Sequence, residues 1–246
     1  MSDLDSRRHA DTSPSRDRFV STAVAGGLDG AVVVVDVLRA FTTAAYAFAA
    51  GTRHIYLVAG VEEALAFKAA MPGSLAMGED RGRRPDDFDF SNSPTEVAAA
   101  DLRDRIIVQR TGSGTQGVVA ARSARRLWCA SLVCASATAA AVRGADLGAP
   151  AYVITGWSAT GPRGSGADDL ATAELIERAR LGSPLEAETT ARFVETSDEA
   201  ARTLALGAGH AHPEDIPRSV AVDAFDFAME VIRTPLGLRL ERVSPG

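Results

Sequence analysis

The chain has 246 residues and a net charge of -6 at pH 7. Its arginines are scattered along the sequence, so no clustered basic face for nucleic acid is expected. It contains neither the apolar core of a signal peptide nor a run of about 18 apolar residues, which predicts a cytoplasmic protein without membrane contact. The length suits one large domain or two small ones, and we expect a single α/β domain.

The first segment has the composition of a flexible tail. Residues 1–17 carry almost no apolar side chains and cannot bury enough surface to offset the entropy of ordering. The expected α/β domain therefore covers residues 18–246. The only two cysteines, Cys129 and Cys134, lie in apolar sequence and are expected to be buried, reduced thiols.

The domain begins with alternating predicted strands and helices. The apolar run 31–35 predicts a strand buried on both faces, and residues 40–50 predict the helix that follows it. A strand at 54–58, a helix at 61–70 and a weaker strand at 74–77 come next. This order is typical of an α/β domain with covering helices, so we expect a largely parallel central sheet.

The second half continues the alternation after a long charged loop at residues 78–94. Strands are expected at 106–108, 127–129 and 151–154, with helices ending near 124, at 135–142 and beginning at Asp168. Later expected elements are an amphipathic helical segment at 186–206, a segment at 213–228 and an edge strand near 238–243.

Polar clusters follow four of these strands. Since the carboxyl ends of parallel strands meet at one sheet edge, four such clusters predict a functional site there. The clusters are Asp36, Arg39, Thr42 and Thr43; Glu79, Asp80 and Asn92; Thr111 to Thr115; and Thr155 to Asp169.

Asp36, directly after the first buried strand, is the leading candidate. Phosphoryl-transfer enzymes of the haloacid dehalogenase type use an aspartate there as nucleophile, with a second aspartate two residues on. That position is Leu38 here, which favours a magnesium ligand or a partner that orients Arg39 over a covalent nucleophile. A helix cap is the structural alternative.

The segment Gly112–Gly117 matches the pattern G-x-G-x-x-G after a strand. A dinucleotide site also needs an acid about 20 residues further on, and residues 131–137 supply none. A nicotinamide-dependent oxidoreductase is therefore disfavoured. The segment is better interpreted as a cradle for a phosphate or sulfonate, with a plain tight turn as the alternative.

Six carboxylates are candidates for binding Mg²⁺, which needs only one or two because it keeps several waters. We select Glu79, Asp168 and Asp169, since each follows a strand. The others are Asp86, Asp87 and Asp89, which are expected to be solvated. The four histidines, which have no hydroxyl or cysteine partner for nucleophilic catalysis, are expected to be structural: His9, His54, His210 and His212. The alternative for His210 and His212 is that they swing over a pocket.

Taken in order, these segments resemble the 2-phosphosulfolactate phosphatase family. The resemblance spans roughly residues 31–180. It rests on Val35–Ala40 with Thr42 and Thr43, Gly78 and Glu79, Phe88 with Ser91–Pro94, Thr111–Thr115 and Asp168 with Asp169. The segment at 213–216, with Asp223 and Asp226, is similar to the family's C-terminal part.

The resemblance implies a three-layer α/β/α fold with a largely parallel central sheet. It also implies a magnesium-dependent enzyme that hydrolyses a small sulfonated phosphoester to sulfolactate and phosphate, on the route to coenzyme M. It carries over a candidate site without assigning roles: Asp36, Arg39, Glu79, Asn92, Thr115, Asp168 and Asp169. From the chemistry of the side chains, we expect Asp36, Arg39 and Glu79 to be catalytic and Mg²⁺ to bind at Asp36, Glu79, Asp168 and Asp169. The substrate would bind Thr42, Thr43, Asn92, Thr111, Ser113, Gly114 and Thr115.

Ser113 replaces an asparagine that is typical of the family. Serine is shorter than asparagine and cannot donate and accept hydrogen bonds through separate atoms, so the identity of the substrate is left open. The alternative function is a non-catalytic anion-binding module that has lost hydrolysis. We expect a small anionic phosphoester as partner and, from the frequency of symmetric dimers, a homodimer.

Overall fold

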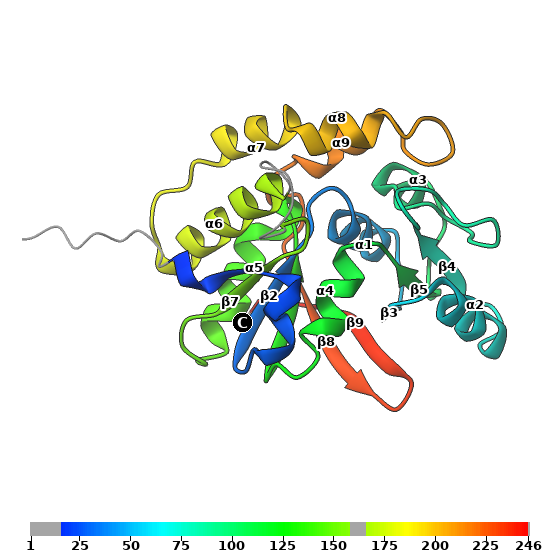
Figure 1. The fold of residues 1–246 in the computed structure, drawn as a ribbon, viewed down its shortest axis with the longest axis horizontal. Coiled ribbons are helices and arrows are strands. Elements are labelled where there is room, and N and C mark those ends of the chain that lie inside the picture. The colour runs from blue at the N-terminus through cyan, green and yellow to red at the C-terminus, as the bar shows by residue number, and fades with distance from the viewer. Residues whose placement is uncertain (1–15, 158–165, 246) are drawn as a thin grey trace, which may run out of the picture.

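The computed structural model describes residues 16–157 and 166–245, within which nine strands form one sheet (Figure 1). The strands are β1 (Phe19–Ser21), β2 (Ala31–Val35), β3 (His54–Val58), β4 (Leu75–Gly78), β5 (Ile106–Arg110), β6 (Arg126–Ala130), β7 (Ala151–Ile154), β8 (Ala228–Thr234) and β9 (Gly237–Val243). Their order across the sheet is β1-β7-β2-β6-β8-β9-β3-β5-β4.

Helices cover both faces of this sheet, as expected for a three-layer α/β/α fold. They are α1 (Ala40–Ala49), α2 (Val61–Ala70), α3 (Pro94–Ala98), α4 (Gly114–Ala120), α5 (Ala135–Gly144), α6 (Ala167–Leu181), α7 (Ala187–Glu195), α8 (Asp198–Leu204) and α9 (Asp215–Ser219). Short 3-10 turns are η1 (Arg16–Arg18), η2 (Thr22–Gly27) and η3 (Leu132–Cys134).

The sheet consists of two parallel blocks joined by a hairpin. One block is β1, β7, β2 and β6, and the other is β3, β5 and β4. Between them lie β8 and β9, which pair antiparallel with each other, with β6 and with β3. Because three successive antiparallel pairings separate the blocks, their strands are not parallel to each other across the hairpin.

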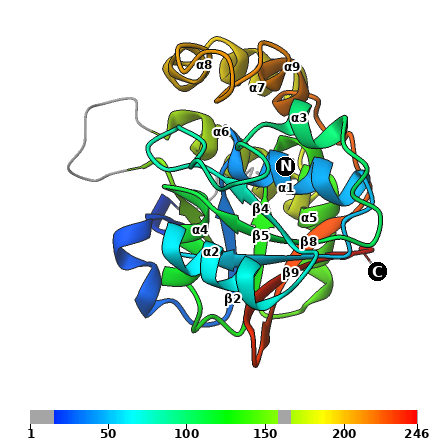
Figure 2. The same cartoon turned by 90° about the vertical axis from the view of Figure 1, so that its right-hand side faces the viewer.

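Alternation along β2 explains the layers. Val32 and Val34 point to the face covered by α1 and α4, whereas Val33 and Val35 point to the face covered by α5 and α6. All four valines are fully buried, as expected for a strand covered on both faces. Figure 2, turned by 90°, shows α2 beside the second block, where it packs on Tyr56 and neighbouring residues.

The α/β order, the buried strands and the buried cysteines are confirmed. The predicted helical segment 186–206 divides into α7 and α8, because Ser197 caps a new helix by accepting a hydrogen bond from the Ala200 N–H at 3.1 Å. The expected edge position of the last strand is wrong, since β9 lies between β8 and β3. The strand β8 was not predicted.

Parts of two other predictions lie outside the described residues. They are residues 1–15 of the expected tail, which include His9, and residues 158–165 of the loop after β7. The described part of the tail, residues 16–17, lies in η1, and Arg18, the first residue of the expected domain, forms an ion pair with Glu177 at 2.9 Å. None of the described helices is long and apolar enough to cross a membrane.

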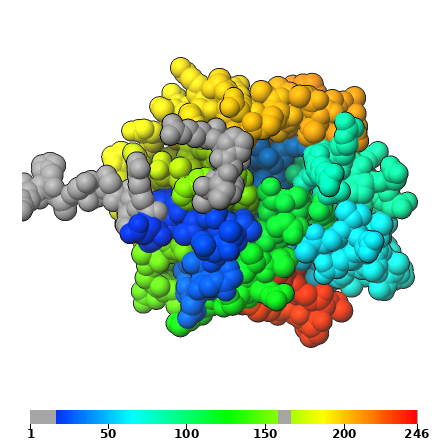
Figure 3. Space-filling model, viewed as in Figure 1, coloured from blue at the N-terminus to red at the C-terminus, as the bar shows by residue number. Residues whose placement is uncertain are grey.

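The segment from α7 to α9 lies over one end of the first block. Figure 1 shows it along the top of the molecule, above the loop that joins β2 to α1. In the space-filling view of Figure 3 the same segment, in yellow and orange, forms the upper surface. The loop after β2 carries Asp36 and Arg39, so this segment covers the region where the sequence predicts a site.

Candidate active site

A cavity of about 550 Å³ lies where the two blocks of the sheet meet. Its walls come from the ends of β2, β4 and β5 and from α8. Five of the predicted site residues line it, together with Gly112 of the predicted anion cradle: Asp36, Arg39, Glu79, Asn92 and Ser113. The structure therefore brings together the first three polar clusters, although the two blocks are not parallel to each other.

Asp36 is nearly buried at the cavity wall. Its Oδ1 accepts a hydrogen bond from the Ala40 N–H at 2.9 Å, which is the helix-capping contact considered from the sequence. Its Oδ2 accepts one from the Thr155 hydroxyl at 3.2 Å. Burial, helped by the negative charge of Glu79 and opposed by the Ala40 N–H, raises the pKa of Asp36 to about 6. Asp36 thus both caps α1 and keeps an oxygen near the cavity.

Asp168 and Asp169 lie behind Asp36 rather than on the cavity wall. Asp169 accepts hydrogen bonds from the Val37 N–H at 2.8 Å, the Gly156 N–H at 3.1 Å and the Thr155 hydroxyl at 3.2 Å. The Thr155 hydroxyl is therefore shared between the carboxylates of Asp36 and Asp169. Burial and the charge of Asp168 raise the pKa of Asp169 well above its usual range.

Asp168 carries a buried carboxylate oxygen, Oδ1, without a hydrogen-bond partner among the described residues. Burial is the main reason that the pKa of Asp168 is raised to about 7, and the charges of Glu199 and Asp36 add to it. A buried acceptor without a partner is costly in an ordinary core. The backbone N–H groups of Asp168 and Asp169 offset this rise in pKa only in part.

Glu79, after β4, is held by two backbone N–H groups. Its Oε1 accepts from Gly112 and its Oε2 accepts from Gly82 at 2.6 Å. Gly78 precedes it with φ +135, and a Cβ there would lie 1.8 Å from the carbonyl oxygen of Arg110, so only glycine fits. Glu79 is therefore fixed between two loops at the cavity wall.

The predicted anion cradle is partly used within the protein. The Gly112 N–H donates to Glu79, and Thr111 and Thr115 exchange hydrogen bonds: each N–H donates to the other hydroxyl, at 2.9 Å and 3.0 Å. Both threonines are buried and do not line the cavity. Their observed contacts fix the turn into α4, and Ser113 remains at the cavity wall.

Gly114 allows the two blocks to approach closely. A Cβ at this position would lie 2.5 Å from the Ala40 Cβ and 2.8 Å from Asp36 Oδ2. Any larger residue would displace either α1 or the Asp36 carboxylate. The glycine in the predicted cradle therefore serves close packing against Asp36.

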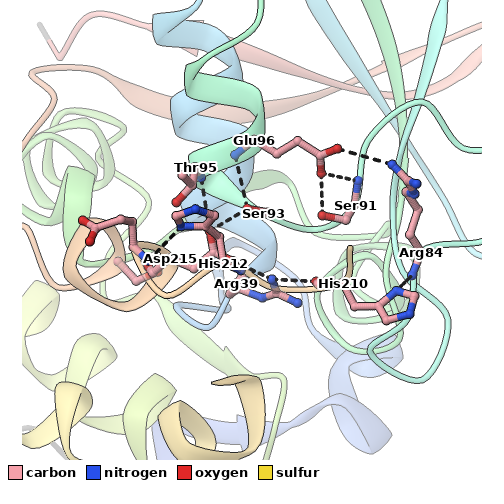
Figure 4. A network of polar contacts seen from close by, with 11 residues as sticks. Arg39, Arg84, Ser91, Ser93, Thr95, Glu96, His210, His212 and Asp215 are labelled. Atoms are coloured by element: carbon pink, nitrogen blue, oxygen red, sulfur yellow. Dashed lines mark hydrogen bonds and ion pairs between the residues drawn. The ribbon is translucent and has the colours of Figure 1, made fainter. Parts of the chain in front are cut away.

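Arg39 is nearly buried and belongs to a polar network drawn in Figure 4. Its Nη1 donates to Asp215 Oδ2 at 2.7 Å and to the His210 carbonyl oxygen at 3.0 Å. Both partners lie far along the chain: His210 lies between α8 and α9, and Asp215 is the first residue of α9. The same guanidinium lines the cavity.

The other predicted substrate residues are buried at different depths. Asn92 lines the cavity, and its Oδ1 is buried without a partner among the described residues. Thr42 donates to the Val37 carbonyl oxygen at 2.8 Å and, like Thr43, does not line the cavity. Direct substrate contact by these two threonines stays a prediction.

The sequence did not identify the part of the cavity wall that α8 and its neighbours contribute. Arg110 donates to the Glu79 carbonyl oxygen at 2.6 Å and to Asp80 at 2.8 Å. Arg202 donates to Glu199 at 2.6 Å. Charged residues in a surface helix have no signal that distinguishes a cavity wall from solvated surface. Besides Asp80 of the second predicted polar cluster, the additional lining residues are Arg81, Gly82, Arg110, Glu199, Arg202, Thr203 and Leu206.

The donor set allows Mg²⁺ with few protein ligands. Within residues 16–157 and 166–245, no group of three or more His, Cys, Asp or Glu side chains is arranged to hold a metal. Mg²⁺ nevertheless needs only one or two carboxylates. The raised pKa values of Asp36 and Asp168, and the unpaired Asp168 Oδ1, show buried carboxylates that a cation would stabilise. The residues therefore fit Mg²⁺ completed by water.

Comparison with known proteins identifies the family. The model of the 2-phosphosulpholactate phosphatase family matches residues 20–218. This range contains every residue of the predicted site and most of the chain. The chain belongs to this phosphatase family. The resemblance drawn from the sequence motifs is thereby confirmed.

Relatives in the family come from bacteria and archaea. A probable 2-phosphosulfolactate phosphatase of Thermus thermophilus is 34% identical over 202 residues, 82% of this chain and 78% of that protein. One from Bacillus subtilis is 36% identical over 145 residues, 59% of this chain and 61% of that protein. One from Thermoplasma acidophilum is 28% identical over 200 residues, 81% of this chain and 85% of that protein.

Proposed function

We propose that the protein is a magnesium-dependent phosphomonoesterase whose substrate is a small anionic phosphoester, with 2-phosphosulfolactate as the first candidate. The supporting observation is the cavity lined jointly by Asp36, Arg39 and Glu79, which come from both blocks of the sheet. Family membership supports the same reaction class. In this reaction water adds to phosphorus, the P–O ester bond breaks and a proton goes to the leaving alkoxide oxygen.

The residues at the cavity have separate roles in this proposal. Arg39 binds a phosphate or a second anionic group, because a guanidinium matches oxyanion geometry. Asp36 holds a cation or orients the attacking water, and Leu38, which also lines the cavity, leaves no acid two residues on for a covalent route. Glu79 fixes the loop that carries Gly112 and Ser113 beside Asp36.

When bound, Mg²⁺ would neutralise charge on the phosphoryl oxygens and the leaving oxygen. Asp36 would hold it, with Asp168 or Asp169 acting directly or through water. Asp169 already uses its oxygens for the Val37 and Gly156 N–H groups, so it keeps the loop after β2 in place. The Thr155 hydroxyl orients the Asp36 and Asp169 carboxylates relative to each other.

Phosphate release from a panel of small phosphomonoesters, with and without Mg²⁺, tests the proposal. We expect release from substrates with a second anionic group, dependence on Mg²⁺ and loss of about 100-fold or more in Asp36→Asn, the scale of a lost electrostatic contact in catalysis. Asp86→Asn is the matched control, because Asp86 is exposed in the loop after β4 and does not line the cavity.

Two results would contradict the proposal. Full turnover by Asp36→Asn would remove Asp36 from the chemistry. Tight binding of these phosphoesters without release under any divalent metal would instead favour the anion-binding module.

A further inference from the structure

The buried contact between Arg39 and Asp215 links the cavity to a distant part of the chain. Arg39 follows β2, whereas Asp215 begins α9, after the segment that covers the cavity. The Arg39 Nη1 to Asp215 Oδ2 distance is 2.7 Å, and both side chains are nearly or fully buried. Asp215 does not line the cavity, while Arg39 does.

Both oxygens of the Asp215 carboxylate accept two hydrogen bonds each. Its Oδ1 accepts from the Ser93 hydroxyl at 2.6 Å and the Thr95 N–H at 3.2 Å. Its Oδ2 accepts from the His212 N–H at 2.9 Å in addition to Arg39. Figure 4 shows these donors converging from three separate segments. A carboxylate has about four acceptor positions, so Asp215 is held firmly and has none left for substrate.

The charge state of Asp215 suits this role. Burial alone would raise its pKa, but the His212 N–H, the Ser93 hydroxyl and the charge of Arg39 together hold the pKa below its usual range. Asp215 therefore stays ionised at neutral pH. The ion pair between Asp215 and the Arg39 guanidinium is therefore kept at neutral pH.

The contacts leave one edge of the Arg39 guanidinium available. Nη1 donates to Asp215 and to the His210 carbonyl oxygen, which uses both of its hydrogens. Among the described residues no hydrogen bond uses Nε or Nη2, and neither atom is among the fully buried unpaired ones. Nε and Nη2 point to the same edge, and such an edge binds an oxyanion through two parallel hydrogen bonds.

We propose that Asp215 is a positioning residue: by fixing Nη1 of Arg39 it presents the Nε and Nη2 edge to an oxyanion of the substrate. The inference rests on the proposed function, because it needs an anionic ligand in the cavity. It adds that α9 and the segment before it determine the geometry of substrate binding without touching the substrate.

The test is a double-mutant cycle of Asp215→Asn and Arg39→Lys, read out by KM, kcat and the affinity for inorganic phosphate. We expect Asp215→Asn to lower kcat/KM about 100-fold, mainly through KM, as a misplacement of about 1 Å can do. In the Arg39→Lys background, which lacks the Nε and Nη2 edge of the guanidinium, the same change should lower kcat/KM less than about threefold. Asp215→Glu keeps the charge, and we expect it to restore part of the loss.

Ser219→Ala is the structural control. Ser219 is buried on α9 and donates to the Asp215 carbonyl oxygen at 2.8 Å, so the change loosens α9 without removing the carboxylate. We expect a lower melting temperature with unchanged KM. If Asp215→Asn does not fold, the cycle is run with Asp215→Glu in both backgrounds, and its KM effect should again vanish with Arg39→Lys.

The phosphate affinity separates failure of this inference from failure of the proposed function. Equal losses from the Asp215 change in both Arg39 backgrounds would overturn the positioning role, as would unchanged phosphate binding and KM in Asp215→Asn. Absence of turnover in the wild type would contradict only the proposed function, because inorganic phosphate binding still tests the pair. Phosphate binding that is insensitive to Arg39→Lys would remove Arg39, and with it the inference.

Discussion

The buried acids near the cavity predict how stability depends on pH. Asp168 has a pKa raised to about 7 from the usual 3.8, so the folded state binds a proton that the unfolded state has lost over this range. The contribution of Asp168 to the free energy of unfolding is largest below pH 3.8, decreases as the pH rises to about 7 and is constant above that pH. At about 1.4 kcal/mol per pKa unit, ionised Asp168 destabilises the metal-free protein by about 4 kcal/mol.

Asp168→Asn removes this titration. In urea unfolding with EDTA, titration of Asp168 should lower the free energy of unfolding of the wild type by about 3 kcal/mol between pH 5 and pH 8. The variant should lack that share of the slope and be more stable than the wild type at pH 8. Addition of Mg²⁺ at pH 8 should raise wild-type stability more than that of the variant, because binding to the folded state alone stabilises it.

Glu174→Gln is the control, since Glu174 is exposed on the same helix α6. Its stability curve should run parallel to that of the wild type. The reasoning is refuted if the curves for wild type and Asp168→Asn are also parallel between pH 5 and pH 8. The pKa of Asp168 would then not be raised by burial.

Two further predictions concern the geometry around Asp36. Gly114→Ala should reduce the rate of phosphate release about 100-fold, because the new Cβ would displace Asp36 or α1. The control Gly144→Ala should leave kcat unchanged, because a Cβ at Gly144 meets nothing within 4 Å. Equal activities of the two variants would contradict the close packing at Gly114. Thr155→Val removes a hydroxyl that lowers the pKa of Asp36, so the acidic limb of the pH–rate profile should move to higher pH. An unmoved limb would show that this carboxylate does not set the limb.

The sequence predicted strands of both blocks, though not β1, because their signals are local. The run at β2 is entirely apolar and ends at Asp36, and the turn residues before α4 lie next to their own strand. The structure places these residues at one cavity, but for a different reason from the one expected. Close packing of Gly114 on Ala40, rather than a continuous parallel sheet, brings the second block to Asp36.

The remaining features depend on contacts between distant residues, which a single sequence does not reveal. β8 has charged residues that favour a surface segment, yet Glu230 is paired with Arg126 of the neighbouring strand at 2.6 Å. Asp215 lies in a polar segment without periodicity, and its role depends on Arg39, far away in the chain. The role of each of these residues depends on a contact with a residue in another helix, strand or loop, which the sequence alone does not show.

The position of the β8 and β9 hairpin has a consequence for synthesis of the protein. Residues 228–243 form the two central strands that join the parallel blocks, so the blocks can complete their common sheet only after this segment leaves the ribosome. Contacts between residues so far apart in sequence form slowly, because loop closure must precede them. Until then β3 and β6 each have an unpaired edge, so the nascent chain is most exposed to mispairing before β8 and β9 are synthesised.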